Sequence, residues 1–529
     1  MSSFNKKRQK ILWISQNRNL QTLGMVINLT TVASINPKIK KIPHKQKILE
    51  YIGLFMVSTI HLLLFSLWTS PYFKDWYGCD ASFFTLVGRG ITEGKVPYRD
   101  FFDLKGPYFF FVEALGQLFA HARTGAFIIQ VPFAFFSLVL IYEICNLFVS
   151  KKKSLFICVV YLWGNITTLW GGNTLEEFIL PVTLGCLYYT LYQLVKNNRS
   201  LENLPVSNMV ILGVALSISL FSKISCGAPI LGIIAAVIFS NITCKNVKQL
   251  LFNLLYLLFG FSLATLPVIL YFGMNSALGD MFYCVFKLGF SRSTNYYESF
   301  NATWELKLSG AALAFVFSVL CRKRIDRNVS IILMAVSAAT WLLLHLGTPF
   351  HYYFTTVYPC MILALALFLK SYDPLILFED AGQIATIILF ALFLGYYVPT
   401  GLDTIDTVVN HRDFIGSDQF VQDVSDMAAL IPECDRDSVH SFMIDMQWFE
   451  ASGIIPCCRY VVNLPFFIEL CPEAEDEILD MIETNPPKWL VIGEDFVENL
   501  PDISDAVLDK YECIYENSSG HLFLLNPNP

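Results

Sequence analysis

A charged stretch from Tyr77 to Pro107 carries the residue types that chemistry at a membrane surface requires. It reads YGCDASFFTLVGRGITEGKVPYRDFFDLKGP and places Asp80, Asp100, Asp103 and Lys105 in an otherwise mostly apolar chain. A carboxylate such as Asp80 can act as general base on an acceptor hydroxyl within hydrogen-bond reach. Lys105 is a compact point charge suited to an anion, most simply a phosphate.

These charged residues also have purely structural interpretations, which stay open at the level of sequence. Asp80 fits the N-cap of a helix that begins at Ala81. Lys105 and Arg99 fit a surface salt-bridge cluster with the two later aspartates, in which each pair contributes only about 0–1 kcal/mol.

Two acids follow a short turn rich in glycine further along the chain. Glu176 and Glu177 open an apolar run, and ionisable groups at a membrane entry usually face a cavity or reach the surface. Thr174 and Glu177 have the spacing of a capping box, which is the structural alternative for Glu177. Acids from different loops can also hold a divalent metal through oxygen ligands.

A further group of polar residues borders the later apolar runs. Lys223 lies between two of them and either binds a lipid phosphate or simply marks the turn. The segment GTPFHYY (347–353) places His351 and Tyr352 at the mouth of a late run. Both side chains suit a phosphate or a sugar, and an aromatic belt is the alternative for the tyrosines.

The composition predicts a polytopic membrane protein. Of the 529 residues 54% are hydrophobic, 15% are charged and the mean hydropathy is +0.51, whereas soluble proteins have about 25% charged residues. Of the 44 acidic residues 26 follow residue 400, against five Lys and Arg there, so the tail is a separate acidic domain. Nucleotide-binding, nucleophile-elbow and zinc-protease motifs are missing from the sequence, and no nucleic-acid partner is expected.

Runs of roughly 20 apolar residues predict membrane spans. We expect eleven, near residues 50–69, 125–149, 154–170, 175–196, 207–222, 224–241, 248–272, 306–321, 328–346, 350–370 and 380–398. With the N-terminus in the cytoplasm, basic groups such as Lys151–Lys153 and Arg322–Arg324 fall on the cytoplasmic side. This scheme requires that Tyr108–Ala120 does not cross the membrane, so we interpret it as an interfacial helix. We interpret residues 80–93 as another such helix.

The predicted fold is a polytopic α-helical membrane protein with extracytoplasmic interfacial helices and a small C-terminal α/β soluble domain. Its parts are a basic cytoplasmic arm (1–48), a transmembrane catalytic domain (49–400) and an acidic extracytoplasmic domain (401–529). The first extracytoplasmic loop covers 71–124. In the tail, strand-like runs such as Trp489–Ile492 and His521–Leu525 alternate with helix-like stretches such as Glu473–Glu483.

The combination of short motifs resembles the GT-C glycosyltransferases, the superfamily of protein O-mannosyltransferases and the lipid A aminoarabinose transferase. An outer-loop Asp is followed by G-x-x-P-Y-x-D-F, here Gly94–Phe101, and by K-G-P, here Lys105–Pro107. The segment GGNTLEEF and the aromatic His/Tyr motif come later. The resemblance is nearest to bacterial family-39-like proteins of the RgtA/B/C/D type and covers roughly residues 50–400.

The resemblance implies roles for individual residues. Asp80 matches the catalytic acid of the first loop, but Ala81 stands where many members have Glu, so Asp100 or Asp103 would supply a second acid. Lys105 matches the lysine near the lipid phosphate. Looser matches connect the second-loop acids to Glu176 and Glu177, and the late motif to His351 and Tyr352.

The function that the resemblance implies is an inverting glycosyltransferase with a polyprenyl-phosphate sugar donor. The acceptor would be a cell-envelope glycan, lipid or protein outside a bacterial plasma membrane. A divalent cation, Mg or Mn, serves some members and stays open here. The alternative is a transporter or flippase of a lipid-linked sugar, but the ionisable residues cluster at one surface instead of the midplane that transporters use.

Overall fold

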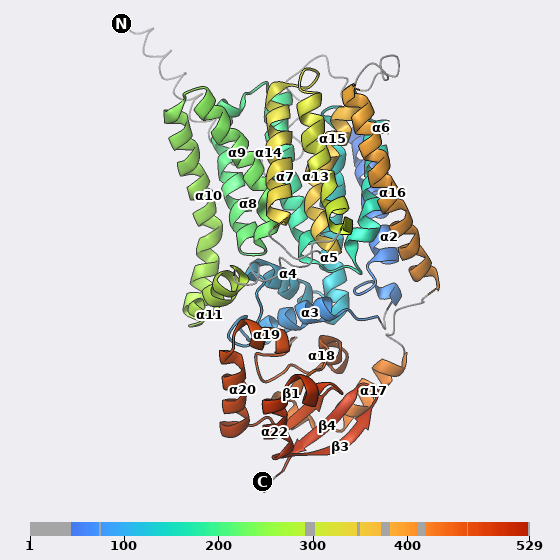
Figure 1. Cartoon of the computed structure of the whole chain (residues 1–529), viewed down its shortest axis with the longest axis vertical. Coiled ribbons are helices and arrows are strands. Elements are labelled where there is room, and N and C mark those ends of the chain that lie inside the picture. The colour runs from blue at the N-terminus through green and yellow to red at the C-terminus, as the bar shows by residue number, and fades with distance from the viewer. Residues whose placement is uncertain are drawn as a thin grey trace. The chain divides into compact units, whose positions relative to one another are not determined.

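The computed structural model of the chain describes residues 44–73, 76–290, 302–345, 350–371, 381–410, 418–462 and 464–526. It divides into two compact units, Met1–Phe55 and Met56–Pro529. The predicted arm 1–48 lies outside the described residues up to residue 43. Within the second unit, long helices dominate and a small sheet lies close to the C-terminus (Figure 1).

Each of the eleven predicted spans coincides with a helix. These are α2 (His44–Phe65), α5 (Ala122–Asn146), α6 (Lys151–Leu169), α7 (Leu175–Val195), α8 (Val206–Leu220), α9 (Ala228–Thr243), α10 (Val247–Met274), α13 (Ala302–Leu320), α14 (Arg327–Leu344), α15 (Tyr358–Ser371) and α16 (Ala381–Asn410). Within the described residues, seven helices are long and apolar enough to cross a membrane, and Val206–Leu220 and Gly310–Leu320 are shorter apolar helices. The chain is therefore a multi-pass membrane protein, while the count of eleven stays a prediction.

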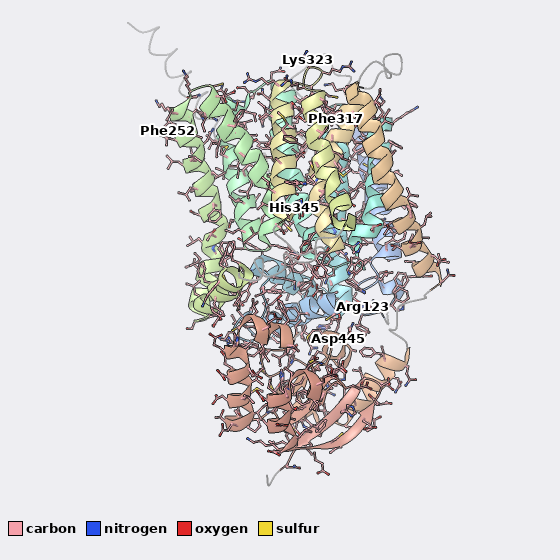
Figure 2. The ribbon with its side chains drawn as sticks, in the orientation of Figure 1. Arg123, Phe252, Phe317, Lys323, His345 and Asp445 are labelled. Atoms are coloured by element: carbon pink, nitrogen blue, oxygen red, sulfur yellow. The ribbon has the colours of Figure 1, made fainter. Side chains whose placement is uncertain are left out.

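The surface of α10 shows why these helices need a lipid environment. Its large apolar side chains point outward, and Leu251, Leu255 and Leu258 are each more than half exposed. Figure 2 shows Phe252 on the outer edge of the helix bundle. Water would penalise so continuous an apolar face, whereas lipid tails cover it at no such cost.

Two short helices between the bundle and the C-terminal domain belong to the predicted first loop (Figure 1). Helix α3 (Cys79–Thr92) and helix α4 (Pro107–Gln117) lie where interfacial helices are expected, and neither is a candidate span. They approach closely because a Cβ on Gly88 would stand 2.7 Å from the Cβ of Glu113. Helix α4 begins with Gly106 at its N-cap and proline at its first position, which suits a helix start.

The N-cap prediction for Asp80 is wrong. Helix α3 begins at Cys79, and Gly78 occupies the N-cap position. Asp80 therefore lies in the first helical turn, where a carboxylate is stabilised by the positive end of the helix dipole without capping the helix.

The C-terminal region forms the expected α/β domain. Strands β1 (Val439–Phe442), β2 (Trp489–Ile492), β3 (Tyr511–Asn517) and β4 (Gly520–Leu525) are ordered β1-β2-β4-β3. The β1–β2 pair is parallel, and β4 is antiparallel to both of its neighbours. The helices of this region are α17 (Asp418–Ala429), α18 (Met446–Ser452), α19 (Leu464–Leu470), α20 (Glu473–Thr484), α21 (Phe496–Asn499) and α22 (Pro501–Leu508).

Short elements complete the described chain. They are α11 (Leu278–Phe282), the π-helical turn η5 (Tyr283–Leu288) and the 3-10 turns η2 (Pro71–Phe73), η3 (Leu201–Asn203), η4 (Ile224–Gly227), η7 (His351–Val357) and η9 (Glu433–Ser438). Helix α16 continues to Asn410, beyond the boundary expected at residue 400. The division into domains at residues 48 and 400 stays a prediction.

Candidate active site

Lys105 stands between two aspartates of the first loop. Its Nζ lies 3.8 Å from Asp80 Oδ1 and 3.5 Å from Asp103 Oδ2. The two carboxylates differ in environment, because the Asp103 side chain is 9% exposed and that of Asp80 is 45% exposed. The Lys105 ammonium also lies 4.9 Å from the centre of the Phe84 ring. The structure thus brings one cation, one buried acid and one accessible acid to the same place.

Tyr98 holds the loop that carries Asp103 and Lys105. It is fully buried and its hydroxyl donates to the carbonyl of Lys105 at 2.7 Å. Its φ of 70° lies in the left-handed region, which is uncommon for a large side chain and is tolerated only where the surroundings enforce it. Sequence reasoning did not single out Tyr98, although it is the tyrosine of the P-Y-x-D-F motif.

Asp100 is used to shape the loop. It accepts a hydrogen bond from the Val96 backbone N–H at 2.6 Å, and Arg99 Nη2 lies 2.9 Å from the same oxygen. Partial burial opposes ionisation, but Arg99 and the Val96 N–H hold the pKa of Asp100 below its ordinary value. Of the three predicted aspartates, the structure therefore brings Asp80 and Asp103, but not Asp100, to Lys105.

A second charged pair joins α7 to the turn after α8. Lys223 Nζ lies 2.6 Å from Glu176 Oε1, and the Glu176 side chain is only 2% exposed. The same ammonium lies 3.3 Å from the ring centre of Tyr353 and 5.2 Å from that of Tyr352. A buried acid and two aromatic rings thus surround the charge of Lys223.

The two lysine sites are connected through the backbone. The N–H of Gly106 donates to the carbonyl of Ser222 at 2.8 Å, and that of Tyr108 donates to the carbonyl of Phe221 at 3.1 Å. A Cβ on Gly106 would lie 2.2 Å from the Phe221 carbonyl oxygen, so only glycine permits this approach. Lys105 directly precedes Gly106, and Lys223 directly follows Ser222, so the backbones of the two lysines lie close together.

The second-loop acids have separate partners. Glu177 forms the predicted capping box with Thr174, whose backbone N–H donates to Glu177 Oε1 at 3.2 Å. Its other oxygen accepts from Gln130 Nε2 at 2.5 Å. Glu177 therefore supports the start of α7, while Glu176 faces Lys223.

The late motif contributes aromatic rings. The ring of His351 stacks on Trp170 with centroids 4.5 Å apart and an interplanar angle of 4°. Tyr352 lies near Lys223, as described above. The first part of the motif, residues 347–349, lies outside the described residues. The structure thus connects the late motif to Trp170 at the end of α6 and to Lys223.

Trp68 links the start of α3 to the glycine-rich turn between α6 and α7. Its backbone N–H donates to the Gly171 carbonyl at 2.8 Å. A Cβ on Gly78 or on Gly171 would come within 2.1 Å or 2.4 Å of the Trp68 ring. The two glycines and the tryptophan are therefore matched in shape, and this contact positions the turn that leads into Asp80.

Arg123 secures the chain before that turn. Its guanidinium donates to the carbonyls of Leu67 and Trp68 at 3.0 and 2.7 Å, and to the carbonyl of Phe73. Figure 2 places Arg123 in the layer between the bundle and the C-terminal domain. Sequence reasoning assigned Arg123 only to the first loop, and no local pattern indicates that it binds backbone carbonyls.

The loop does not fit a resident divalent cation. The Lys105 ammonium already stands between the carboxylates of Asp80 and Asp103, where such an ion would need oxygen ligands. Across the part of the chain that the structure describes, no group of three or more His, Cys, Asp or Glu residues is arranged to hold a metal.

Comparison with known proteins gives a fold but no close relative. No family model matches the chain, and no curated protein matches it. The crystal structure of ArnT from Cupriavidus metallidurans bound to undecaprenyl phosphate is similar, with a TM-score of 0.54 and 10% identity over 92% of this chain and 99% of that chain. ArnT in the apo state gives a TM-score of 0.55 and 10% identity over 90% and 98%.

The apo oligosaccharyltransferase of Archaeoglobus fulgidus is less similar, with a TM-score of 0.49 and 12% identity over 90% of this chain and 74% of that chain. The likeness to ArnT extends over nearly the whole of both chains. This chain therefore has the fold of ArnT, and the fold that the resemblance predicted is confirmed.

Proposed function

We propose that the chain is an inverting glycosyltransferase that moves a sugar from a polyprenyl phosphate to a hydroxyl of an acceptor outside a bacterial plasma membrane. The observation that carries the proposal is the position of Lys105, which lies between Asp80 and Asp103 and is joined by backbone to Lys223. The fold shared with ArnT supports it, because one ArnT structure contains undecaprenyl phosphate.

The two lysines are suited to the phosphate of the donor. Lys105 is only partly buried and has a loose contact with Asp80, so an entering phosphate can attract its ammonium. Lys223 adds a second positive charge on the neighbouring turn, oriented by Glu176. Positive groups fixed where charge develops on the leaving phosphate stabilise the transition state. His351 and Tyr352 would contact the donor from the side of Trp170, at the end of α6.

Asp80 is suited to the acceptor. When Lys105 turns toward the phosphate, the Asp80 carboxylate can accept a hydrogen bond from the acceptor hydroxyl instead of contacting the ammonium. It then accepts the proton of the acceptor hydroxyl while that oxygen bonds to the anomeric carbon. The bond from the anomeric carbon to the phosphate oxygen breaks with inversion. The phosphate leaves as a weak base and requires no general acid. Asp103, more buried than Asp80, would hold Lys105 in position.

Transfer of a radiolabelled sugar from polyprenyl phosphate to candidate acceptors tests the proposal. Asp80→Asn should lower kcat by about 10²–10⁴-fold, the usual contribution of a general base. Lys105→Ala should raise the KM for the donor. The matched controls are Asp502→Asn on α22 and Lys323→Ala. Figure 2 places Lys323 at the end of the bundle that is remote from α3 and α4. Both controls should keep wild-type activity.

Two outcomes would contradict the proposal in different ways. Translocation of the lipid without release of the sugar would support a flippase. Full activity of Asp80→Asn would remove Asp80 from the mechanism.

Two further properties are tested separately. A requirement for Mg or Mn is tested by adding a chelator. The orientation in the membrane is tested by a membrane-impermeant thiol reagent, which should reach the exposed Cys513 from outside.

A further inference from the structure

A carboxylate of the C-terminal domain lies beside the first turn of α3. Asp445 follows β1, and its Oδ1 lies 3.8 Å from Cys79 Sγ, next to Asp80 in sequence. Figure 2 shows Asp445 on the side of its domain that faces the layer of α3 and α4. The two residues of this contact are 366 positions apart, so tertiary packing brings them together.

The local backbone directs Asp445 away from its own helix. Asp445 occupies the N-cap position of α18, where an aspartate commonly accepts a hydrogen bond from the first turn. In the described helix its carboxylate forms no such cap. The left-handed φ of 54° at Met443 turns the chain sharply just before it. The side chain is therefore available at the surface, where it is exposed.

The location of this turn is one that α/β domains use for ligands. Strands β1 and β2 are parallel, and Asp445 follows the carboxyl end of β1. Ligands of open α/β sheets bind outside the carboxyl ends of the strands. Here that edge is fixed against the first loop, because Gln447 Nε2 donates to the carbonyl of Tyr77 at 3.4 Å. The edge of the sheet and the start of α3 thus border one region.

The charges around Cys79 show how close these groups are. Burial, then the carboxylates of Asp445 and Asp80, raise the pKa of the Cys79 thiol to about 12, while Lys105 opposes them. The two acids therefore flank the thiol, and Lys105 lies beyond Asp80 on the donor side. Both acids are accessible to solvent, so each can contact a molecule from the surrounding water.

We propose that Asp445 binds the acceptor and determines its specificity, by accepting a hydrogen bond from a donor group beside the reacting hydroxyl. This inference rests on the proposed function and adds to it that the C-terminal domain completes the acceptor site. Asp80 takes the proton of the reacting hydroxyl, and Asp445 fixes the neighbouring group. That group is either a second hydroxyl of a saccharide or an ammonium, and the charge of Asp445 distinguishes them.

Kinetics on the full chain with simple acceptors test the inference. At saturating donor, methyl hexoside is the neutral probe and methyl 2-amino-2-deoxyhexoside is the cationic probe. Asp445→Ala should raise the acceptor KM by about tenfold or more, the scale of a hydrogen bond to a charged group, and lower kcat by less. Asp445→Asn keeps an oxygen acceptor without charge. It should recover most of the affinity if the group is a hydroxyl, and little if it is an ammonium.

The controls separate failure of this inference from failure of the proposed function. Asp502→Ala, an exposed aspartate of the same domain, should leave the acceptor KM unchanged. Thermal unfolding of Asp445→Ala and Asp445→Asn in detergent checks that both variants fold. One result would overturn the inference alone: the wild type transfers sugar or hydrolyses the donor, while both Asp445 variants keep the acceptor KM of the wild type. Absence of both reactions in the wild type would overturn the proposed function, and the inference with it.

Discussion

Lys105 and Lys223 flank a single backbone hydrogen bond, in which the N–H of Gly106 donates to the carbonyl of Ser222 at 2.8 Å. One lysine belongs to the first loop and the other to the turn after α8. Each has its own carboxylate partners, Asp80 and Asp103 for Lys105 and Glu176 for Lys223. The separation of the two positive charges therefore depends on how closely these two backbones approach.

Gly106→Ala tests this dependence. The new Cβ would lie 2.2 Å from the Phe221 carbonyl oxygen and must push the two segments apart. A shift of about 1 Å in the position of a binding group can lower activity about 100-fold, so we expect a loss of this order in transferase kcat/KM. The control is Gly273→Ala in α10, where a Cβ meets nothing within 4 Å. Wild-type activity in Gly106→Ala would show that the approach is not needed.

Lys223→Met tests the buried ion pair. Removing the cation leaves the Glu176 carboxylate buried without its partner, which typically costs about 3–5 kcal/mol. Lys223→Met with Glu176→Leu removes both charges and should be more stable than Lys223→Met alone. Thermal unfolding in detergent measures both. Lys287→Met is the control, because Lys287 also lies over a tyrosine ring but is exposed. Equal stability of the single and double variants would argue against a buried charge.

Local spacing was sufficient to predict the parts of the fold that depend on near neighbours. The capping box of Thr174 and Glu177 needs only residues three apart, and it is present. Strand β2 coincides with the apolar run Trp489–Ile492, because a short buried strand requires a run of this kind. The cap assigned to Asp80 failed because α3 begins two residues earlier than expected, an uncertainty common at helix ends.

Contacts across the chain could not be predicted in this way. Lys223 meets Glu176 over 47 residues and Asp445 meets Cys79 over 366, and no periodicity connects them. Asp100 and Asp103 are only three residues apart, yet the first shapes the loop and the second faces Lys105. Their different roles follow from the left-handed turn at Tyr98, which the sequence shows only as a tyrosine after a proline.

The burial of Glu113 predicts how the free energy of unfolding depends on pH. It is fully buried in α4, beside Asn173 but without a hydrogen bond of good geometry. Burial raises its pKa to about 8; Asn173 opposes this, and Glu450 and Glu177 add to it. The folded state therefore keeps a proton that the unfolded chain loses near pH 4.5. The free energy of unfolding is therefore highest below pH 4.5. It falls between pH 4.5 and 8, by up to about 1.4 kcal/mol per pH unit.

Glu113→Gln should remove this slope, because an amide does not titrate. Between pH 4.5 and 8, the free energy of unfolding should fall less steeply with pH in Glu113→Gln than in the wild type. Glu93→Gln is the matched control, because Glu93 is half exposed and pairs with Arg89 at 2.8 Å. Parallel profiles for the wild type and Glu113→Gln would show that Glu113 ionises at its ordinary pH in the folded protein.

The contacts of Arg459 connect the C-terminal domain to the first loop, and they predict how strongly that domain stabilises the loop. Its carbonyl accepts from the Phe102 N–H at 2.8 Å, and its guanidinium lies 2.6 Å from Glu477 and 3.7 Å from Asp280. The Phe102 ring, buried against Tyr460 and Phe467, lies 5.4 Å below the guanidinium. Arg459 thus connects Glu477 of its own domain and Asp280 of α11 to the loop that carries Asp103.

Arg459→Met should loosen that loop while keeping an apolar cover over Phe102. Charge-assisted hydrogen bonds contribute about 1.5–3 kcal/mol each, so exchange of the amide hydrogens of residues 96–105 should become about tenfold faster or more. Transferase kcat should fall with it, because Lys105 and Asp103 lose their fixed separation. Arg436→Met, an exposed arginine in η9 of the same domain, should exchange like the wild type. Faster exchange confined to the C-terminal domain would mean that Arg459 stabilises only that domain, and that the Phe102 contact alone holds the loop.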